Sequence, residues 1–343
     1  MRDIVQRAVD EGVLAVVRRR FGYSRIVGLC GVPLRPPLFC TSFCLRCKMV
    51  PRASRLWLFN NPKSSAPFAK SSSLCYNDSM PPLTPLKIRG FKQEGRKIVA
   101  LTVYDYPSAK MLDSAGIDIL LVGDSLGNVI QGKPTTLSVT LNQVLYHAEM
   151  VARASQNALV VVDLPFPYCQ LGADEAVRAG ARILKETLAG AVKLEGGENR
   201  AETIAALVEA GIPVIGHCGL RPQDIRQTGG YFVQRQKEQL LRDVQAVEQA
   251  GAFAVVLECL EAELAKEATQ SVSLPTIGIG SGRHCDGQIL VFHDLLGYTP
   301  ERQPALKHVK QYADLHTVIS DAVQKYAEEV RNREFPVDEH SFQ

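Results

Sequence analysis

The chain has 343 residues, of which 46% are hydrophobic and 22% are charged, and its formal net charge is +3. This composition predicts a soluble, globular protein that buries one large core or two small ones. No apolar run reaches the roughly 18 residues that a membrane-spanning helix requires, so the composition excludes a protein that spans a membrane.

Residues 1–82 have a strongly basic composition that the rest of the chain does not share. They hold 13 Lys and Arg against 4 Asp and Glu, a net charge of +9, whereas the remainder holds 26 against 32, a net charge of −6. No acidic residue occurs between Gly12 and Asn77. Because this positive charge lies outside the regularly patterned region, it does not indicate a nucleic acid as the ligand of the body.

We interpret residues 1–82 as a targeting segment that is mostly disordered, ahead of a catalytic unit at residues 83–343. A segment rich in Arg and Ser and poor in acids is typical of an organellar presequence, and the apolar residues and arginines of positions 2–20 suit an amphipathic basic helix. The sequence therefore predicts import into the mitochondrial matrix. The alternative is an untranslated upstream segment with initiation at Met49 or Met80, which predicts a cytoplasmic protein.

Nine cysteines are present, and five of them lie in residues 1–82. Cys44 and Cys47 have the spacing of half a zinc site, but tetrahedral zinc needs four ligands and no second Cys or His pair lies nearby. The four cysteines of the body show no disulfide framework, which is typical of a reducing compartment. They are Cys169, Cys218, Cys259 and Cys285.

From Lys97 onward, short β-branched runs alternate with longer segments of helical period, as in βαβ units with a parallel sheet. Eight strands are predicted, at 98–103, 117–123, 159–164, 191–194, 213–216, 253–258, 275–279 and 288–293. Helices are predicted at 107–114, 141–154, 174–188, 201–210, 237–250 and 261–269, with further helical segments at 308–316 and 318–332. Several of the helices end at a glycine suited to a left-handed cap, namely Gly116, Gly190, Gly211 and Gly251. Eight such repeats predict a (β/α)8 barrel, that is, a TIM barrel with C-terminal helices, in preference to an open doubly wound sheet.

Polar side chains stand at the end of nearly every predicted strand, where the active site of such a barrel is built. Carboxylates there are costly unless they are paired or bind a cation. The residues at these positions are Asp105, Asp124, Ser125, Asp163, Lys193, Glu195, His217, Glu258, Ser281, His293 and Asp294. We therefore expect the active site among them.

Asp124, Asp163 and Glu195 form an all-oxygen set that suits a hard divalent ion such as Mg²⁺. The alternative is that these acids form salt bridges with Lys193 and other bases at the barrel rim. Lys193 and Glu195 are two residues apart, so on a strand both point the same way. One would then hold an anionic substrate, and the other would belong to the metal site.

Glu258 ends the apolar strand AVVLE, where desolvation would raise its pKa toward that of a useful general base. The alternative is an acid that caps the following helix. His217, in GHCGL, either donates a hydrogen bond to a substrate carboxylate or enolate oxygen or is a satisfied core residue. The glycines from Gly278 to Gly282 do not have the spacing of a dinucleotide-binding loop.

The motifs at these positions occur together and in order along the body of the chain. They are LTVYDYPSAKMLDSAGIDILLVGDSLG, VVDLPF, VKLEGG, GHCGLRPQ, VVLE, IGIGSG and DGQILVFHDLLG. Together they resemble the successive signature blocks of the ketopantoate hydroxymethyltransferase family. The resemblance runs from about Leu83 to the C-terminus and covers none of residues 1–82.

The resemblance implies a magnesium-dependent (β/α)8 enzyme of one-carbon metabolism. Its reaction would transfer the one-carbon unit of 5,10-methylenetetrahydrofolate to 3-methyl-2-oxobutanoate through a magnesium-stabilised enolate, giving 2-dehydropantoate for pantothenate and coenzyme A biosynthesis. Folate would be a cosubstrate. The resemblance also implies a homo-oligomer, and the C-terminal helices are candidates for its contacts.

Residue roles carry over motif by motif. Asp124 and Asp163 would ligate magnesium beside the oxo acid, and Glu195 would reach the metal directly or through water. The oxo acid would be bound by Ser125 and Lys193, and Glu258 would be the base. Two departures put the folate contacts in doubt, namely Arg221 where the family usually has Thr, and the segment 168–170 after DLPF.

Two rival interpretations remain at this point. One is a lyase or mutase of the same barrel type that acts on phosphoenolpyruvate or isocitrate, although the Lys-Cys-Gly type of lid motif that such enzymes usually carry is absent from the sequence. The other is a binding protein on an inactive barrel, whose basic residues 1–82 grip RNA or an anionic membrane. Aromatic residues are sparse in that segment, and the full set of strand-end carboxylates argues against loss of activity.

Overall fold

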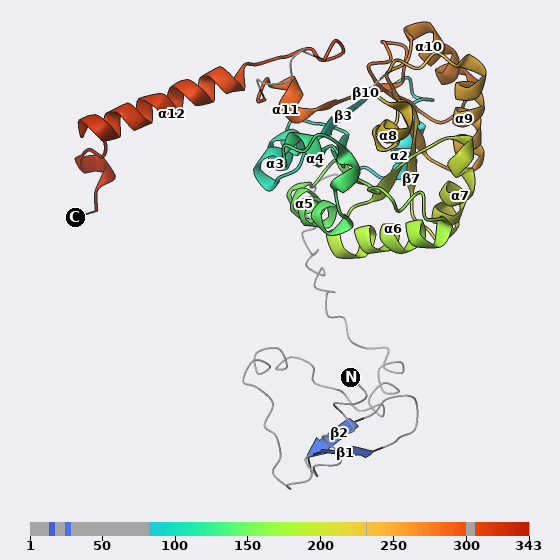
Figure 1. Ribbon diagram of the computed structural model, residues 1–343, viewed down its shortest axis with the longest axis horizontal. Helices are drawn as coiled ribbons and strands as arrows, with labels where there is room; N and C mark the ends of the chain where they lie inside the picture. The colour runs from blue at the N-terminus through green and yellow to red at the C-terminus, as the bar shows by residue number, and fades with distance from the viewer. Residues whose placement is uncertain (1–13, 18–24, 29–81, 231, 300–305, 343) are drawn as a thin grey trace, which may run out of the picture. The chain divides into compact units, whose positions relative to one another are not determined.

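The computed structural model describes residues 14–17, 25–28, 82–230, 232–299 and 306–342 (Figure 1). The chain divides into two compact units, Met1–Leu74 and Cys75–Gln343. The first unit contains an antiparallel pair of strands, β1 (Leu14–Val17) and β2 (Arg25–Gly28). Most of the predicted targeting segment lies outside the described residues. At Leu14–Val17, where we expected part of a basic helix, the chain is extended.

The second unit is a closed barrel of eight parallel strands in the order β10-β3-β4-β5-β6-β7-β8-β9. The strands are β3 (Ile98–Thr102), β4 (Ile119–Val122), β5 (Leu159–Asp163), β6 (Ala191–Glu195), β7 (Val214–Gly219), β8 (Ala254–Glu258), β9 (Thr276–Ile279) and β10 (Gly287–Val291). Strand β10 pairs with β3 and closes the barrel. The predicted (β/α)8 fold is therefore confirmed.

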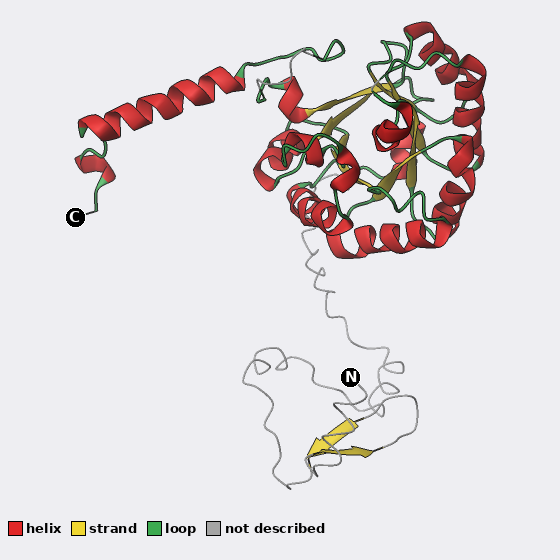
Figure 2. Cartoon of the chain, viewed as in Figure 1, coloured by secondary structure: helices red, strands yellow, loops and turns green. Residues whose placement is uncertain are grey.

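Long helices form a ring around the strands (Figure 2). They are α3 (Tyr106–Ser114), α5 (Leu141–Ala154), α6 (Ala173–Thr187), α7 (Ala201–Glu209), α9 (Lys237–Gln249) and α10 (Ala262–Ser271). The long helix α12 (Leu315–Asn332) is not part of this ring. Shorter helical segments are α2 (Pro85–Gly90), α4 (Leu126–Val129), α8 (Ile225–Thr228), α11 (Phe292–Leu295), η2 (Thr136–Ser138), η3 (Glu198–Arg200), η4 (Pro222–Asp224) and η5 (Asp338–His340). Most of the predicted helices match within a few residues.

Local hydrogen bonding explains where some helices begin. The Thr140 side chain accepts from the Gln143 backbone N–H, and the Gln143 side chain accepts from the Thr140 N–H, so α5 begins with a capping box. The Asp105 side chain accepts from the Ser108 N–H at 2.8 Å and caps α3. Asp105, which we placed among the strand-end acids, is therefore a helix cap.

Three local expectations were wrong. Residues 308–313 are not helical, because backbone N–H groups near them bond to the end of α11: Tyr312 donates to Leu295 O at 2.8 Å. The last barrel strand stops at Val291, and α11 follows at once, so His293 and Asp294 lie on a helix. The left-handed residue at the end of α6 is Leu188, with φ 64°, and not Gly190.

The inside of the barrel is apolar at one end and polar at the other. On β5, Leu159 and Val161 belong to the apolar cluster inside the barrel, and Asp163 is the next residue on the same face. On β6, Ala191 belongs to the same cluster, and Lys193 and Glu195 follow it with the same period. The alternation of strand side chains therefore carries the polar groups to the carboxyl ends of the strands.

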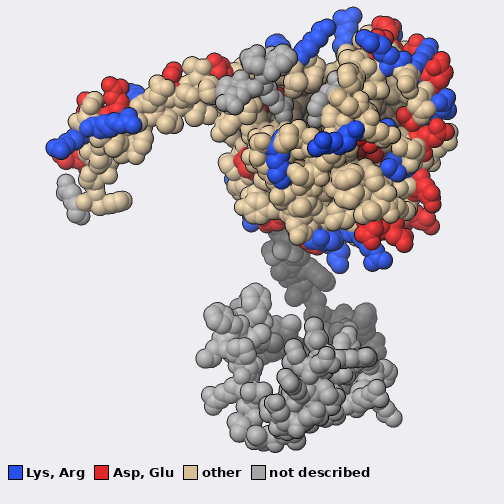
Figure 3. All heavy atoms as spheres, viewed as in Figure 1, with Lys and Arg blue, Asp and Glu red and all other residues tan. Residues whose placement is uncertain are grey.

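The outer faces of the strands pack against the helices in a second and larger apolar cluster. On the face shown in Figure 3, basic and acidic side chains are interspersed over the barrel unit. Among the described residues, no helix is both long enough and apolar enough to cross a membrane.

One buried carboxylate fastens the loop between α5 and β5 to helix α3. Asp113 is 6% exposed and accepts hydrogen bonds from the Ser155 hydroxyl and from the backbone N–H groups of Gln156, Asn157 and Ala158, at 2.8–3.1 Å. Burial alone would raise the pKa of Asp113, but these donors lower it below its ordinary value.

We expect Asp113→Ala to lower the free energy of unfolding by about 3 kcal/mol, because three backbone N–H groups, of which that of Ala158 is buried, would lose their acceptor. Urea denaturation monitored by circular dichroism measures this change. Asp174→Ala, at the exposed first turn of α6, is the matched control and should cost less than about 1 kcal/mol. Equal losses in the two variants would contradict the role given to Asp113.

Candidate active site

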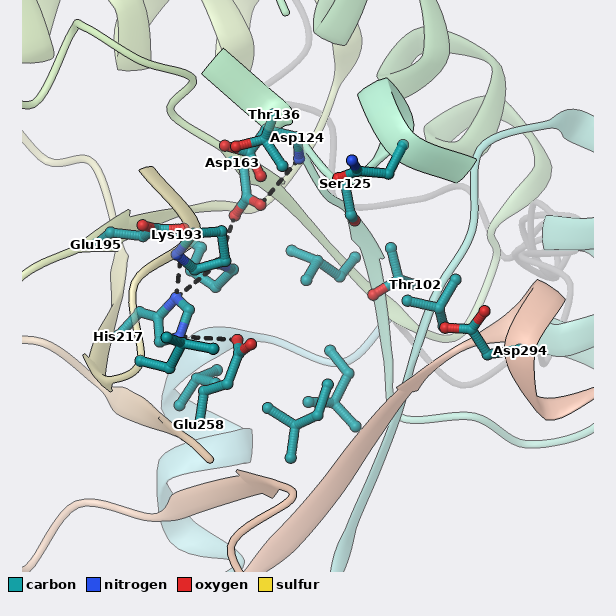
Figure 4. Close-up of a pocket in the computed structure, with 18 of the residues that line it drawn as sticks. Thr102, Asp124, Ser125, Thr136, Asp163, Lys193, Glu195, His217, Glu258 and Asp294 are labelled. Atoms are coloured by element: carbon teal, nitrogen blue, oxygen red, sulfur yellow. Dashed lines mark hydrogen bonds and ion pairs between the residues drawn. The ribbon is translucent and has the colours of Figure 1, made fainter. Parts of the chain in front are cut away.

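A cavity of about 510 Å³ opens at the carboxyl ends of the barrel strands. All seven residues that we predicted for the site line it (Figure 4). They are Asp124, Ser125, Asp163, Lys193, Glu195, His217 and Glu258. They come from the ends of β5, β6, β7 and β8 and from the two residues that follow Gly123 after β4.

The acidic side of the cavity is held together around Lys193. Its Nζ lies 3.0 Å from Asp163 Oδ1, and the other carboxylate oxygen of Asp163 accepts from the Asp124 backbone N–H at 3.1 Å. Asp124, Asp163, Lys193 and Glu195 are each at most 6% exposed. The alternative of a salt bridge with Lys193 is therefore correct for Asp163, but this bridge is buried and not at an open rim.

Burial and mutual repulsion shift the pKa values of these acids. Burial, and then the charge of Asp163, raise the pKa of Asp124 to about 7. Burial, and then the charge of Asp124, also raise the pKa of Glu195. Burial alone would lower the pKa of Lys193, but the surrounding carboxylates raise it above its ordinary value. With all four groups ionised, three carboxylates and one ammonium carry a net charge of −2.

The donor set suits a divalent cation by its chemistry. Asp163 Oδ1 is buried and, apart from its ion pair with Lys193, accepts no hydrogen bond among the described residues. A net charge of −2, carried by the group when all four members are ionised, is what Mg²⁺ would balance. However, no three Asp, Glu, His or Cys side chains of the described chain already converge at metal-ligand positions, so the magnesium site stays a prediction.

His217 lies between Lys193 and the predicted base. Its Nδ1 is 3.2 Å from Lys193 Nζ, and its Nε2 is 3.1 Å from Glu258 Oε2. An ammonium group can only donate, so Nδ1 accepts and the ring proton is assigned to Nε2, which faces Glu258. Burial, and then the charge of Lys193, lower the pKa of His217, so the ring is neutral at neutral pH.

Glu258 is at the end of β8, and its side chain is 18% exposed. It does not cap the following helix, because α10 begins at Ala262 and Glu261 occupies the cap position. Glu258 lines the cavity together with apolar side chains of the barrel interior, including Val256 and Ile279. These apolar side chains form the floor of the cavity. Glu258 is therefore placed to act on a substrate atom that lies above this apolar floor.

Two serines of the region have protein partners. The Ser125 hydroxyl lies 2.9 Å from the Tyr104 hydroxyl. Ser281, between two glycines after β9, is fully buried and donates to Leu257 O at 2.7 Å. The glycine-rich loop therefore packs its serine against β8, which agrees with our rejection of a nucleotide loop.

Sequence reasoning missed Gln223. This residue is in η4, is 5% exposed, and donates to Asp124 Oδ2 at 2.9 Å from Nε2 and to Glu195 Oε2 at 3.0 Å from its backbone N–H. The only signal was its place in the motif GHCGLRPQ, four residues after the end of β7. Nothing in that pattern indicates contacts with two acids from other strands.

A closed (β/α)8 barrel with buried acids, a lysine and a candidate base at the carboxyl ends of its strands defines a barrel enzyme. The sequence profile described as ketopantoate hydroxymethyltransferase matches residues 83–338. The chain belongs to this family, and the predicted hydroxymethyltransferase is confirmed at that level.

Two curated relatives illustrate the match, and both are called 3-methyl-2-oxobutanoate hydroxymethyltransferase. The protein of Rhodopirellula baltica is 51% identical over 261 residues, which is 76% of this chain and 96% of the relative. The protein of Thermoanaerobacter sp. is 50% identical over 264 residues, with shares of 76% and 96%. Because these relatives are transferases, the lyase, mutase and binding-protein interpretations are not retained.

Among solved structures, a 2,3-dimethylmalate lyase of the PEP mutase/isocitrate lyase superfamily is similar with a TM-score of 0.49 at 19% identity. The match covers 76% of this chain and 92% of that one. A likeness of this size identifies neither the family nor the activity of the chain.

We expect Asp124→Asn to stabilise the metal-free protein, and more so at pH 8 than at pH 5. The folded pKa of Asp124 is raised to about 7, so this group destabilises the fold increasingly as pH rises from the unfolded value, about 4, through 7. An amide avoids this cost, and the gain at pH 8 should be on the order of 1–3 kcal/mol. Urea denaturation with a chelator present measures it. A difference between parent and variant that is the same at both pH values would contradict the assignment.

Proposed function

We propose that this chain transfers the one-carbon unit of 5,10-methylenetetrahydrofolate to 3-methyl-2-oxobutanoate and produces 2-dehydropantoate. The observation that carries the proposal is a single cavity with a lysine and three acids on one side and Glu258 on the other. The names of relatives at 50–51% identity, matched over 96% of their own length, support the substrate.

The lysine side of the cavity suits the polar end of the 2-oxo acid. The ammonium of Lys193 would attract the substrate carboxylate, and the Ser125 hydroxyl would donate to a substrate oxygen. The apolar floor below them, with Val256 and Ile279, suits the branched hydrocarbon end. The substrate would then lie with its C3 atom toward Glu258.

Glu258 would take the proton from C3, and the carbon would then bond to the methylene group of the folate. The C3–H bond breaks and a C–C bond forms. Both bonds from the methylene carbon to the folate nitrogens break, and one water supplies the new hydroxyl group. Tetrahydrofolate leaves, and its two nitrogens take up the C3 proton and one proton of the water. In the proposed pose, Glu258 lies within reach of C3, and the hydrocarbon end of the substrate lies on the apolar floor. These surroundings favour removal of the C3 proton over reactions that would place charge at the hydrocarbon end.

Asp124, Asp163 and Glu195 would hold Mg²⁺, which supplies a Lewis acid for the oxygens of the 2-oxo acid when bound. The net charge of −2 that the group carries when all its members are ionised supports a divalent ion. Lys193 would keep its contact with Asp163 and so orient that carboxylate.

We propose that His217 positions Glu258, in place of the substrate contact expected from the sequence. Both ring nitrogens lie within 3.2 Å of a protein group, Lys193 Nζ on one side and Glu258 Oε2 on the other. A neutral ring that presents Nε2–H to the carboxylate would aim Glu258 without neutralising it.

We also propose a homo-oligomer. Among the described residues, α12 has no buried side chain, and it exposes an apolar series at helical spacing. The series comprises Ile319, Val323, Tyr326 and Val330. Burial of such a face against another subunit would support this assembly.

We expect Glu258→Gln to lower the exchange of the C3 proton of 3-methyl-2-oxobutanoate with solvent deuterium by at least about 100-fold, because an amide is not a base. Proton NMR measures exchange, and product assays with folate and magnesium measure the full reaction. Substrate affinity should remain, because Lys193 and Ser125, and not Glu258, are the proposed contacts of the polar end of the substrate. Glu261→Gln, three residues along and paired with Arg235 on the surface, is the control and should behave as the parent. Unchanged exchange in the Glu258 variant would reject this base.

We propose the mitochondrial matrix as the location, on the composition of residues 1–82. A reporter fused to residues 1–82 should enter isolated mitochondria and become protected from protease. A matched fusion with the arginines of positions 2–20 changed to glutamine should remain outside. A wild-type fusion that stays outside would contradict targeting and favour initiation at Met49 or Met80.

A further inference from the structure

The turn after β7 brings one neutral side chain into the acidic side of the cavity. Gln223 is 5% exposed, and its Nε2 donates to Asp124 Oδ2 at 2.9 Å and to Leu164 O at 3.0 Å. Its backbone N–H donates to Glu195 Oε2 at 3.0 Å. One residue therefore holds two carboxylates that come from β4 and β6, with β5 between them.

Neighbouring groups determine which way the amide of Gln223 points. Its Oε1 accepts from Gln170 Nε2 at 3.2 Å, so the oxygen faces away from the acids. Both hydrogens of Nε2 are then used, one on Asp124 and one on Leu164 O. The reverse orientation would bring an amide oxygen against a carboxylate and a carbonyl, which is unfavourable.

The turn itself is fastened on both sides. Gly219 has φ +94°, and a Cβ there would lie 2.4 Å from Glu258 O, so only glycine fits. The next residue, Leu220, donates its N–H to the same Glu258 oxygen at 2.9 Å. Arg221 and Asp224 form an ion pair at 2.7 Å across the turn. The turn that carries Gln223 is therefore held rigidly against β8, the strand that ends in the proposed catalytic Glu258.

The hydrogen bonds of Gln223 engage one oxygen of each acid, Oδ2 of Asp124 and Oε2 of Glu195. A buried donor that fixes the rotamer of a carboxylate orients it for a cation. Because Gln223 is neutral, it holds the two acids without offsetting the negative charge that attracts the cation. A lysine or arginine at this position would do the opposite.

We propose that Gln223 is a positioning residue for a divalent cation, and that it presents Asp124 and Glu195 to this ion in a fixed geometry. This inference rests on the proposed function only in requiring that a cation binds at these acids. It gives no role to Gln223 in the transfer of the proton or of the one-carbon unit.

The test is Mn²⁺ binding to the full chain without substrates, measured by electron paramagnetic resonance of the free ion. We expect Gln223→Met, which keeps the volume of the side chain and removes its hydrogen bonds, to bind Mn²⁺ about 10–100-fold more weakly than the parent. Activity of the variant should recover toward the parental kcat at high metal concentration. A merely structural defect would not be rescued in this way.

Two further variants complete the test. Gln239→Met removes a similar amide–carboxylate hydrogen bond, to Asp243 at 3.0 Å on the outer helix α9, and should leave Mn²⁺ affinity unchanged. Gln170→Leu removes only the donor to Gln223 Oε1 and should weaken Mn²⁺ binding in the same direction by a smaller factor. It also serves if Gln223→Met fails to fold.

Parental Mn²⁺ affinity in Gln223→Met, or no Mn²⁺ binding by the parent, would overturn the inference. Product formation by the parent distinguishes the two proposals. A parent that forms no 2-dehydropantoate but loses Mn²⁺ affinity on Gln223→Met supports the role of Gln223 and rejects the reaction. A productive parent with equal Mn²⁺ affinity in the variant retains the reaction and rejects the role of Gln223.

Discussion

The buried ammonium of Lys193 is the group on which the polar end of this barrel depends. It lies 3.0 Å from Asp163 and 3.2 Å from His217, at the centre of a group of acids that burial and mutual repulsion make costly. Its charge offsets part of that repulsion, and its purely donating character sets the tautomer of His217. One side chain thus connects the acids on one side of the cavity to Glu258 on the other.

This arrangement is possible because a strand turns every second side chain inward. The lower layers of the barrel are filled by residues such as Val161 and Ala191, which supply the burial that stabilises the fold. The same faces end in Asp163, Lys193 and Glu195. On each of these strands, the residues that stabilise the fold therefore precede the charged residues of the cavity. The apolar layer excludes water from beneath the charged layer.

Two loops hold the acidic side chains of the cavity more closely in place than the strands alone do. The two departures from the family pattern that we noted, Arg221 and the segment 168–170, both lie beside Gln223. Arg221 closes the turn that carries Gln223, and Gln170 orients its amide. These side chains therefore have partners within the protein, and the geometry of the acidic group depends on contacts from two loops as well as on the barrel.

The sequence by itself determined the eight strands, most of the helices and the set of polar residues at the strand ends, because strand and helix periods are local properties that repeat along the chain. Family resemblance then supplied the proposed reaction. Only the tertiary structure decided that Asp105 caps a helix, that His217 lies between Lys193 and Glu258, and that Gln223 holds Asp124 and Glu195. Contacts such as Gln223 with Asp124 join residues 99 positions apart, and no local pattern encodes them, because they exist only once the barrel has closed.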